Sequence, residues 1–92
     1  MVTLKRLVLD VLKPHQPSAL DFCSRIAELG ADYQVSLNVE EVDENTQTLS
    51  LEIRGGALDM AVIETAIADM GASLHSVDQV EVHNEGGDGE QA

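Results

Sequence analysis

Two short, widely separated segments carry side chains that are able to bind a ligand or a metal ion, or to move protons. The residues are Asp10, Lys13 and His15 in the first segment, and His75, Ser76 and Asp78 in the second. Imidazole and carboxylate groups together suit borderline divalent cations, and an imidazole beside a carboxylate can also act as a general base. If the fold brings the two segments together, we expect a polar corner with one of these functions.

Two overlapping sets of residues follow from this chemistry. The cation ligands are expected to be Asp10, His15, His75 and Asp78. Contacts to a small-molecule ligand are expected from Asp10, Lys13, His15 and Ser76. The spacing matches no metalloenzyme motif, since there is no His-x-x-x-His pair on a helix, and we assign no catalytic residue.

A purely structural interpretation of the same residues stays open. In it, Asp10 and Lys13 form an ion pair, and His15 fixes its loop through a hydrogen bond to the backbone. Ser76 or Asp78 would then satisfy amide groups at the end of a strand. Metal or ligand binding and catalysis are the two functional alternatives.

The elements around the first segment are marked by alternation and by helix signals. Residues 2–12 alternate between apolar and polar side chains, which predicts a strand. Pro14 and Pro17 predict an ordered loop after it. Ser18 is a good N-cap for a helix over 19–29, which Gly30 ends.

The rest of the chain predicts a hairpin, a second helix and a last strand. Residues 33–40 and 49–54 alternate on either side of a turn at 43–46. Asp59 can cap a helix that ends at Gly71. Residues 74–82 form the last strand, with Val80 and Val82 facing inward and an irregularity near Asp78, where the alternation slips.

This order of elements, βαββαβ, predicts an α+β ferredoxin-like fold. Right-handed crossovers give a four-stranded antiparallel sheet in the order 4-1-3-2, with both helices on one face. The last strand then runs beside the first, which is why the two polar segments should meet. We expect residues 1–83 to form the domain and residues 84–92 to be a disordered acidic tail.

The net charge of −12 limits the partners that the chain can have. Five basic residues are too few for nucleic-acid binding, and no apolar run approaches the roughly 20 residues that span a bilayer. With no signal peptide at Met1, we expect a cytoplasmic protein. The acidity fits a surface adapted to high salt, as in halophilic proteins, or a cationic partner.

The charge is also unevenly distributed, and the core is small. Residues 1–31 hold four basic residues against three acidic ones, whereas residues 32–92 hold one arginine against fourteen acids. The basic end of one copy can therefore meet the acidic end of another, a head-to-tail contact of the kind that closes rings. With no Trp, one Phe and one Tyr, the core of a monomer buries little apolar surface. Association between copies would add stabilising free energy, which also favours a homo-oligomer.

The runs Arg6-Leu-Val-Leu-Asp-Val-Leu-Lys-Pro-His-Gln-Pro17 and Leu74-His-Ser-Val-Asp-Gln-Val80 carry a resemblance. The sequence resembles an archaeal family of short uncharacterised proteins, Domain of Unknown Function 211, over nearly the whole chain to about His83. The resemblance implies a ferredoxin-like fold and homo-oligomers, including rings. It implies no reaction, because the family has no established activity.

These observations favour an uncharacterised, non-enzymatic, homo-oligomeric domain. We expect it to bind a small ligand or a divalent cation at the polar corner between the first and last strands, and the only cofactor suggested is that cation. One alternative is a small enzyme in which His15 or His75 acts as a base oriented by Asp10 or Asp78. The other is an assembly scaffold without a ligand.

Overall fold

The strands and helices follow one another in the predicted order. The computed structural model describes residues 1–86. The strands are β1 (Val2–Pro14), β2 (Gln34–Val42), β3 (Thr46–Arg54) and β4 (Ser73–Asn84), and the helices are α1 (Ala19–Ala27) and α2 (Met60–Asp69). The ferredoxin-like βαββαβ fold is thus confirmed.

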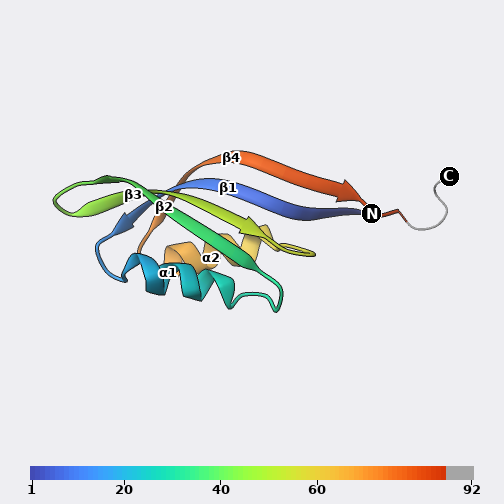
Figure 1. Ribbon diagram of the computed structural model, residues 1–92, viewed down its shortest axis with the longest axis horizontal. Coiled ribbons are helices and arrows are strands. Elements are labelled where there is room, and N and C mark those ends of the chain that lie inside the picture. Colours follow the sequence, from blue (N-terminus) through green and yellow to red (C-terminus); the bar gives the residue numbers. More distant parts are fainter. Residues whose placement is uncertain (87–92) are drawn as a thin grey trace.

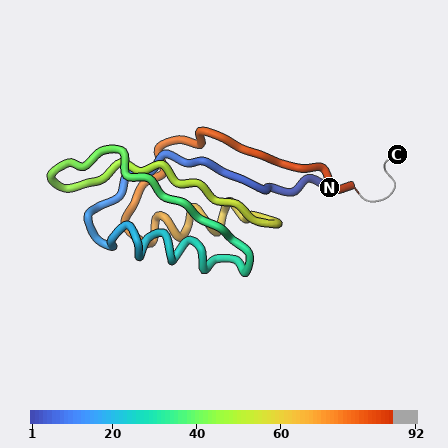
Figure 2. The backbone as a smooth tube through the Cα atoms, viewed as in Figure 1, coloured from blue at the N-terminus to red at the C-terminus, as the bar shows by residue number. Residues whose placement is uncertain are grey.

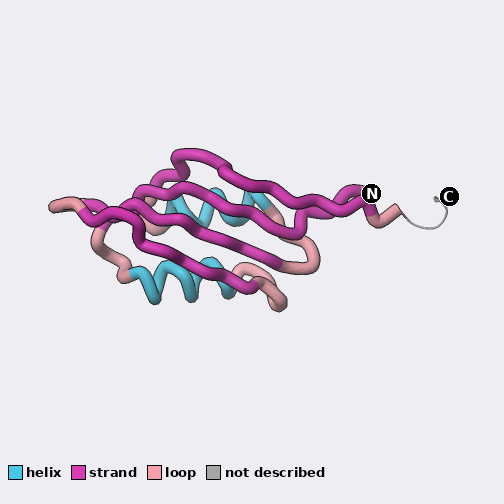
Figure 3. The backbone as a smooth tube through the Cα atoms, turned by 45° about the horizontal axis from the view of Figure 1, so that its top comes forward, coloured by secondary structure: helices cyan, strands magenta, loops and turns pink. Residues whose placement is uncertain are grey.

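One antiparallel sheet forms a layer above two helices. Its strands lie in the order β2-β3-β1-β4, which is the predicted 4-1-3-2 order counted from the other edge. Figure 1 shows both helices beneath the same face of the sheet, and Figure 3 shows the strands side by side. β2 and β4 are the two edge strands, and the other face of the sheet, here called the open face, has no helix over it.

Period-two alternation in the two central strands builds the core. Alternate side chains of β1 and β3 point toward the helices and pair directly across the sheet. The buried residues of these strands are Leu7, Leu9, Val11, Leu49, Leu51 and Ile53, and the helices add Phe22, Ile26, Ile63 and Ile67. The interior is almost wholly aliphatic, as the composition requires.

Both helices begin at the predicted caps. The Ser18 side chain accepts a hydrogen bond from the Asp21 amide, and the Asp59 side chain accepts one from the Val62 amide. Each cap satisfies an amide that the first helical turn leaves without a partner. α1 ends at Ala27, two residues before the predicted end, and α2 is followed by Gly71 with a φ of +81°, a conformation that favours glycine.

The pairing of β1 with β4 is irregular at three points. The register passes over Lys5 on β1 and over His75 and Asp78 on β4. An extra residue on one strand of an antiparallel pair is a β-bulge, which bends the strand and re-aims neighbouring side chains. The predicted irregularity near Asp78 is confirmed, and two of the six candidate residues, His75 and Asp78, are themselves the extra residues.

The outer ends of β1 and β4 form a projecting ribbon, which we call the terminal arm (residues 1–4 and 80–85). Figures 1 and 2 show it extending beyond the helices. Val80 and Val82 pair with Leu7 and Leu4, so they face the helix side, but they are 54% and 52% exposed. The two valines thus face the predicted side of the sheet, but they are not buried in the core, because neither helix extends beneath this end of the sheet.

The described residues reach slightly beyond the predicted domain boundary. Asn84 is the last residue of β4, and the Glu85 amide donates to the Met1 carbonyl. The rest of the predicted tail, residues 87–92, lies outside the described residues. Within residues 1–86, α1 and α2 are 9 and 10 residues long, and no helix has the length and apolar character needed to cross a bilayer.

Candidate functional site

Asp10 and His75 meet on the open face of the sheet. Asp10 pairs with Ser76 across β1 and β4, and the bulge at His75 leaves this imidazole beside the same carboxylate. His75 Nδ1 lies 3.9 Å from Asp10 Oδ2, and the side chains are 52% and 30% exposed. The contact is too long for a hydrogen bond, so it becomes an attraction only when His75 is protonated.

Ser76 and Asp78 form a second pair on the same edge strand. The Ser76 hydroxyl donates a hydrogen bond of 2.7 Å to Asp78 Oδ1. Both side chains are exposed. Four of the predicted site residues therefore lie together on the first half of β4 and the facing part of β1, and we call this group the polar corner (Asp10, His75, Ser76 and Asp78).

His15 points to a different part of the molecule. Its Nε2 lies 3.0 Å from the carbonyl oxygen of Asp43 and 3.1 Å from that of Glu44. Both partners are acceptors, so Nε2 carries the proton and donates. The side chain ties the loop after β1 to the turn between β2 and β3, as the structural interpretation proposed, and does not join the polar corner.

Lys13 lies on the helix side of β1 and is wholly buried. Its side chain is 0% exposed, and Nζ donates to the carbonyl oxygens of Pro14 (2.7 Å), Pro17 (2.6 Å) and His15 (3.4 Å). Burial lowers the pKa of this amine. The predicted ion pair with Asp10 is wrong, because Asp10 faces the open side of the sheet, and Lys13 is not available to a ligand at the surface.

The polar corner supplies only part of a metal coordination sphere. Among residues 1–86, no three His, Cys, Asp or Glu side chains lie close enough together to hold a metal ion. Asp10 and His75 offer one oxygen and one nitrogen donor, and Asp78 uses one of its oxygens for Ser76. Water, a small molecule or a second copy of the chain has to complete any bound complex.

A charged cluster of three residues also lies on the open face. Glu52 accepts a hydrogen bond from Arg6 Nε and lies 3.1 Å from Arg54 Nη2. The hydrogen bond from Arg6, with the added charge of Arg54, lowers the pKa of Glu52. The register of β1 and β3 brings these residues together, because it places Arg6 opposite Arg54 and Val8 opposite Glu52.

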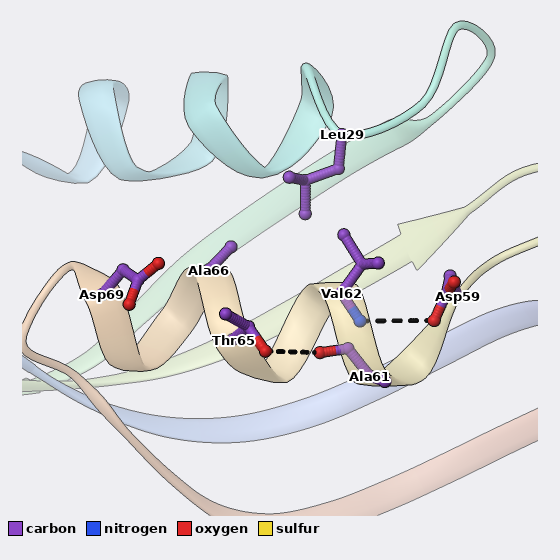
Figure 4. Close-up of a pocket in the computed structure, with 7 residues that line it drawn as sticks. All are labelled: Leu29, Asp59, Ala61, Val62, Thr65, Ala66 and Asp69. Carbon is purple, nitrogen blue, oxygen red and sulfur yellow. Dashed lines mark hydrogen bonds between the residues drawn. The ribbon is translucent and has the colours of Figure 1, made fainter.

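A surface hollow that sequence reasoning missed lies between the two helices. We call it the interhelical groove, and it has a volume of about 360 Å³. Figure 4 shows its lining, which consists of Leu29, Asp59, Ala61, Val62, Thr65, Ala66 and Asp69. The two acidic side chains stand at opposite ends of α2, and the apolar ones lie between them. No sequence signal could reveal it, because it depends on how far apart α1 and α2 pack.

Comparison with known proteins places the chain in a family without a known activity. The family model described as uncharacterized ArCR, Domain of Unknown Function 211, matches residues 5–85. The chain is similar to the uncharacterized protein MJ0319 of Methanocaldococcus jannaschii, with 35% identity over 77 residues, which cover 84% of this chain and 79% of the relative. The chain belongs to the Domain of Unknown Function 211 family.

Proposed function

We propose that the chain is a non-enzymatic, homo-oligomeric domain of the cytoplasm, with ring closure as one form of assembly, that binds a divalent cation or a small ligand at the polar corner. The observation that carries this proposal is the pair Asp10 and His75, 3.9 Å apart and open to solvent beside a bulged edge strand. Mixed oxygen and nitrogen donors suit borderline cations such as Zn²⁺ or Mn²⁺.

The electrostatics of the corner support binding of a cation. Among residues 1–86, the one basic side chain within 4 Å of Asp10 is His75, which is neutral unless protonated. Asp78 adds a second carboxylate on the same strand. A metal ion binds the deprotonated forms of imidazole and carboxylate groups, so protons compete with the cation for the corner and binding should weaken as the solution becomes more acidic.

The location on an edge strand supports a role at the boundary between copies. β4 pairs only with β1 in the described chain, so its outer backbone edge has no strand partner there. Unpaired edge strands are common sites of strand pairing between chains. A second copy near this edge would bring further donors to a site that two side chains leave incomplete.

The geometry favours binding over general-base chemistry. A general base is normally oriented by a carboxylate within hydrogen-bonding distance. The His75 to Asp10 contact is longer than that, and the Nε2 atom of His15 is held by two backbone carbonyls. The enzyme alternative would need both histidines to change partners.

The test is a titration of the folded protein with Zn²⁺, Mn²⁺ and Mg²⁺, observed through the imidazole NMR signals. We expect the His75 signals to shift or broaden with at least one ion, while His15 stays unchanged as an internal control. Asp10→Asn keeps the imidazole of His75 as a probe and should remove the response.

Two results would count against this proposal. If none of the three ions perturbs His75, cation binding is wrong and only the small-ligand version remains. That version predicts that native mass spectrometry finds a molecule bound to the purified protein and lost in Asp10→Asn. If neither ion nor molecule is found, the binding function is wrong.

A further inference from the structure

We propose that the Ser76 hydroxyl competes with the bound cation for Asp78, so that binding at the polar corner transfers this carboxylate from the serine to the ion. This inference rests on the cation binding proposed above and adds how the affinity of that site is set. It is carried by one juxtaposition, in which Ser76 faces Asp10 across β1 and β4 and is hydrogen-bonded to Asp78.

The spacing of Asp10 and His75 lets one ion contact both side chains. Their atoms Oδ2 and Nδ1 lie 3.9 Å apart. A Zn²⁺ ion binds a carboxylate oxygen or an imidazole nitrogen at about 2.0–2.2 Å. Two such bonds together are longer than the separation of the two atoms, so neither side chain has to move away to admit the ion. Half of a four-coordinate shell is then left without a protein donor.

Asp78 is the carboxylate placed to supply a third donor. It is the extra residue of the bulge between Val77 and Gln79 on β4, and it follows shortly after Ser76, the direct partner of Asp10. Diagonal neighbours across an antiparallel pair lie about 7–8 Å apart, a distance that side chains can bridge. An ion between two carboxylates shortens the reach that each of them needs.

In the free chain the Asp78 carboxylate is turned toward Ser76 instead. The serine hydroxyl donates to Asp78 Oδ1 at 2.7 Å. No ion pair within residues 1–86 includes Asp78. The serine hydroxyl is therefore the group that a cation has to displace.

This hydrogen bond is one that a cation can displace. Both side chains are exposed, so water competes for each partner, and a hydrogen bond in such a setting shifts an equilibrium by roughly 2- to 10-fold. A divalent ion carries a full double charge where the hydroxyl offers only a dipole, so it attracts a carboxylate more strongly. Ser76 thus lowers the affinity of the corner through a bond that exists only when the ion is absent.

A supporting role for Ser76 predicts the opposite sign. In that arrangement Asp78 would keep Oδ1 on the serine and bind the ion through Oδ2, with the hydroxyl orienting the ligand. Loss of such an outer-shell partner typically weakens metal binding by about 10- to 100-fold. In its present orientation, however, Asp78 does not form a three-residue metal group with Asp10 and His75 within residues 1–86, so the carboxylate has to leave the serine to reach the ion.

Zinc titrations of three matched variants test the transfer. The dissociation constant is measured from the imidazole NMR signals of His75, which report the corner itself. Ser76→Ala removes the competing hydroxyl and should lower the dissociation constant about 3-fold or more, whereas Asp78→Asn removes the third donor and should raise it about 10-fold or more. Glu40→Gln removes the same charge from an exposed bulge residue of β2, the opposite edge strand, and should leave it nearly unchanged. Amide NMR spectra check that each variant folds.

A double variant isolates the contact between the two side chains. If the serine acts only by holding Asp78, then adding Ser76→Ala to Asp78→Asn should not tighten binding, because no carboxylate is left to release. Tighter binding in the double variant than in Asp78→Asn alone would show that the serine acts on the ion by another route, and the transfer would be wrong.

The outcomes separate this inference from the function on which it rests. The transfer is overturned if Ser76→Ala weakens binding or leaves it unchanged, or if Asp78→Asn weakens it no more than Glu40→Gln does. His75 signals that respond to none of Zn²⁺, Mn²⁺ and Mg²⁺ in the wild type would overturn cation binding altogether. A response that Asp10→Asn removes, and that the other variants leave intact, would reject only the transfer.

Discussion

The two ends of the β1 strand reverse the usual relation between side-chain polarity and burial. At the loop end Lys13 is 0% exposed, whereas at the terminal end Val2 is 65% exposed and Val82, on the neighbouring strand, is 52% exposed. Lys13 and Val2 lie on the same strand, where Lys13 pairs with β3 and Val2 pairs with β4. Burial here is decided by what lies over the strand, because the helices cover the loop end and leave the terminal end bare.

The burial of Lys13 is possible because the chain supplies its hydrogen bonds locally. Three carbonyl oxygens of the loop after β1 accept from the ammonium, while the aliphatic stem continues the apolar face of Leu9 and Val11. A buried charge is costly unless it is fully hydrogen-bonded. The loop contains two prolines, which have no backbone N–H to donate, and the lysine ammonium supplies the hydrogen bonds that hold the loop in place.

Replacing Lys13 should produce the largest loss of stability. In Lys13→Ala the stem leaves a cavity and the carbonyls of Pro14, His15 and Pro17 lose their donor. We expect the free energy of unfolding to fall by about 2–5 kcal/mol. Urea denaturation followed by circular dichroism measures this.

Lys13→Met is the matched control, since it keeps most of the stem and removes only the donor. It should cost about 1–3 kcal/mol, the expected penalty for leaving buried acceptors unsatisfied. If both variants unfold at the wild-type urea concentration, the lysine does not hold the loop, and the contrast between the two ends of β1 loses its basis.

The pH dependence of stability should show the charge of Lys13 directly. Burial lowers its pKa below the ordinary value of 10.5, so the unfolded chain holds this proton at a pH where the folded chain has released it. Between these two values the unfolded state binds more protons, and stability rises with pH. The free energy of unfolding of the wild type minus that of Lys13→Met should therefore rise as the pH approaches 10.5, and a difference that falls over this interval would contradict the lowered pKa.

Much of the fold was predictable because single residues and short patterns specify it. The alternation around Leu9 and Leu51 predicts central strands with one buried face. Ser18 and Asp59 predict the helix starts, and the order of elements then restricts the topology to one sheet. The exposure of Val80 and Val82 was not predictable, because alternation indicates which face a side chain takes and not whether a helix reaches that far.

The candidate site was predictable only in part, for a similar reason. Antiparallel neighbours bring Asp10 and Ser76 together whatever the side chains are, so topology alone predicts the polar corner. The direction in which His15 points depends on how close the β2–β3 turn comes to the loop after β1 in space, which no local sequence pattern indicates. Lys13 falls on the buried face by simple alternation with Leu9 and Val11. The pattern therefore indicated its burial, but a charged side chain is expected at the surface.

A smaller effect is expected on the open face, where Glu52 lies near the middle of the sheet. Its pKa is lowered mainly by the hydrogen bond from Arg6, and its side chain is 24% exposed. Glu52→Gln should cost about 1 kcal/mol at neutral pH. This advantage of the wild type is fully present above the ordinary value of 4.5 and should vanish as the pH falls through the lowered pKa of the folded state. Thermal unfolding at pH 7 and pH 3 measures it, and an equal difference at both values would exclude the ion pair as its source.

The smallest change in the free energy of unfolding should come from the terminal end of β1. The same substitution, valine to threonine, made at an exposed and at a buried position shows why. Val2→Thr places a hydroxyl where water already reaches, so at concentrations that keep the chain monomeric its free energy of unfolding should change by less than about 0.5 kcal/mol. Val11→Thr makes the same change where the side chain is 0% exposed, and a buried hydroxyl without an added partner should cost about 1–3 kcal/mol. Equal losses would mean that Val2 is packed within its own chain, and the contrast between the two ends of β1 would fail. If Val2→Thr leaves the monomer unchanged but lowers stability at concentrations where the wild type associates, the loss belongs to the contact between copies, because a partner that binds only the folded state stabilises it by an amount that grows with the concentration of that partner relative to its dissociation constant.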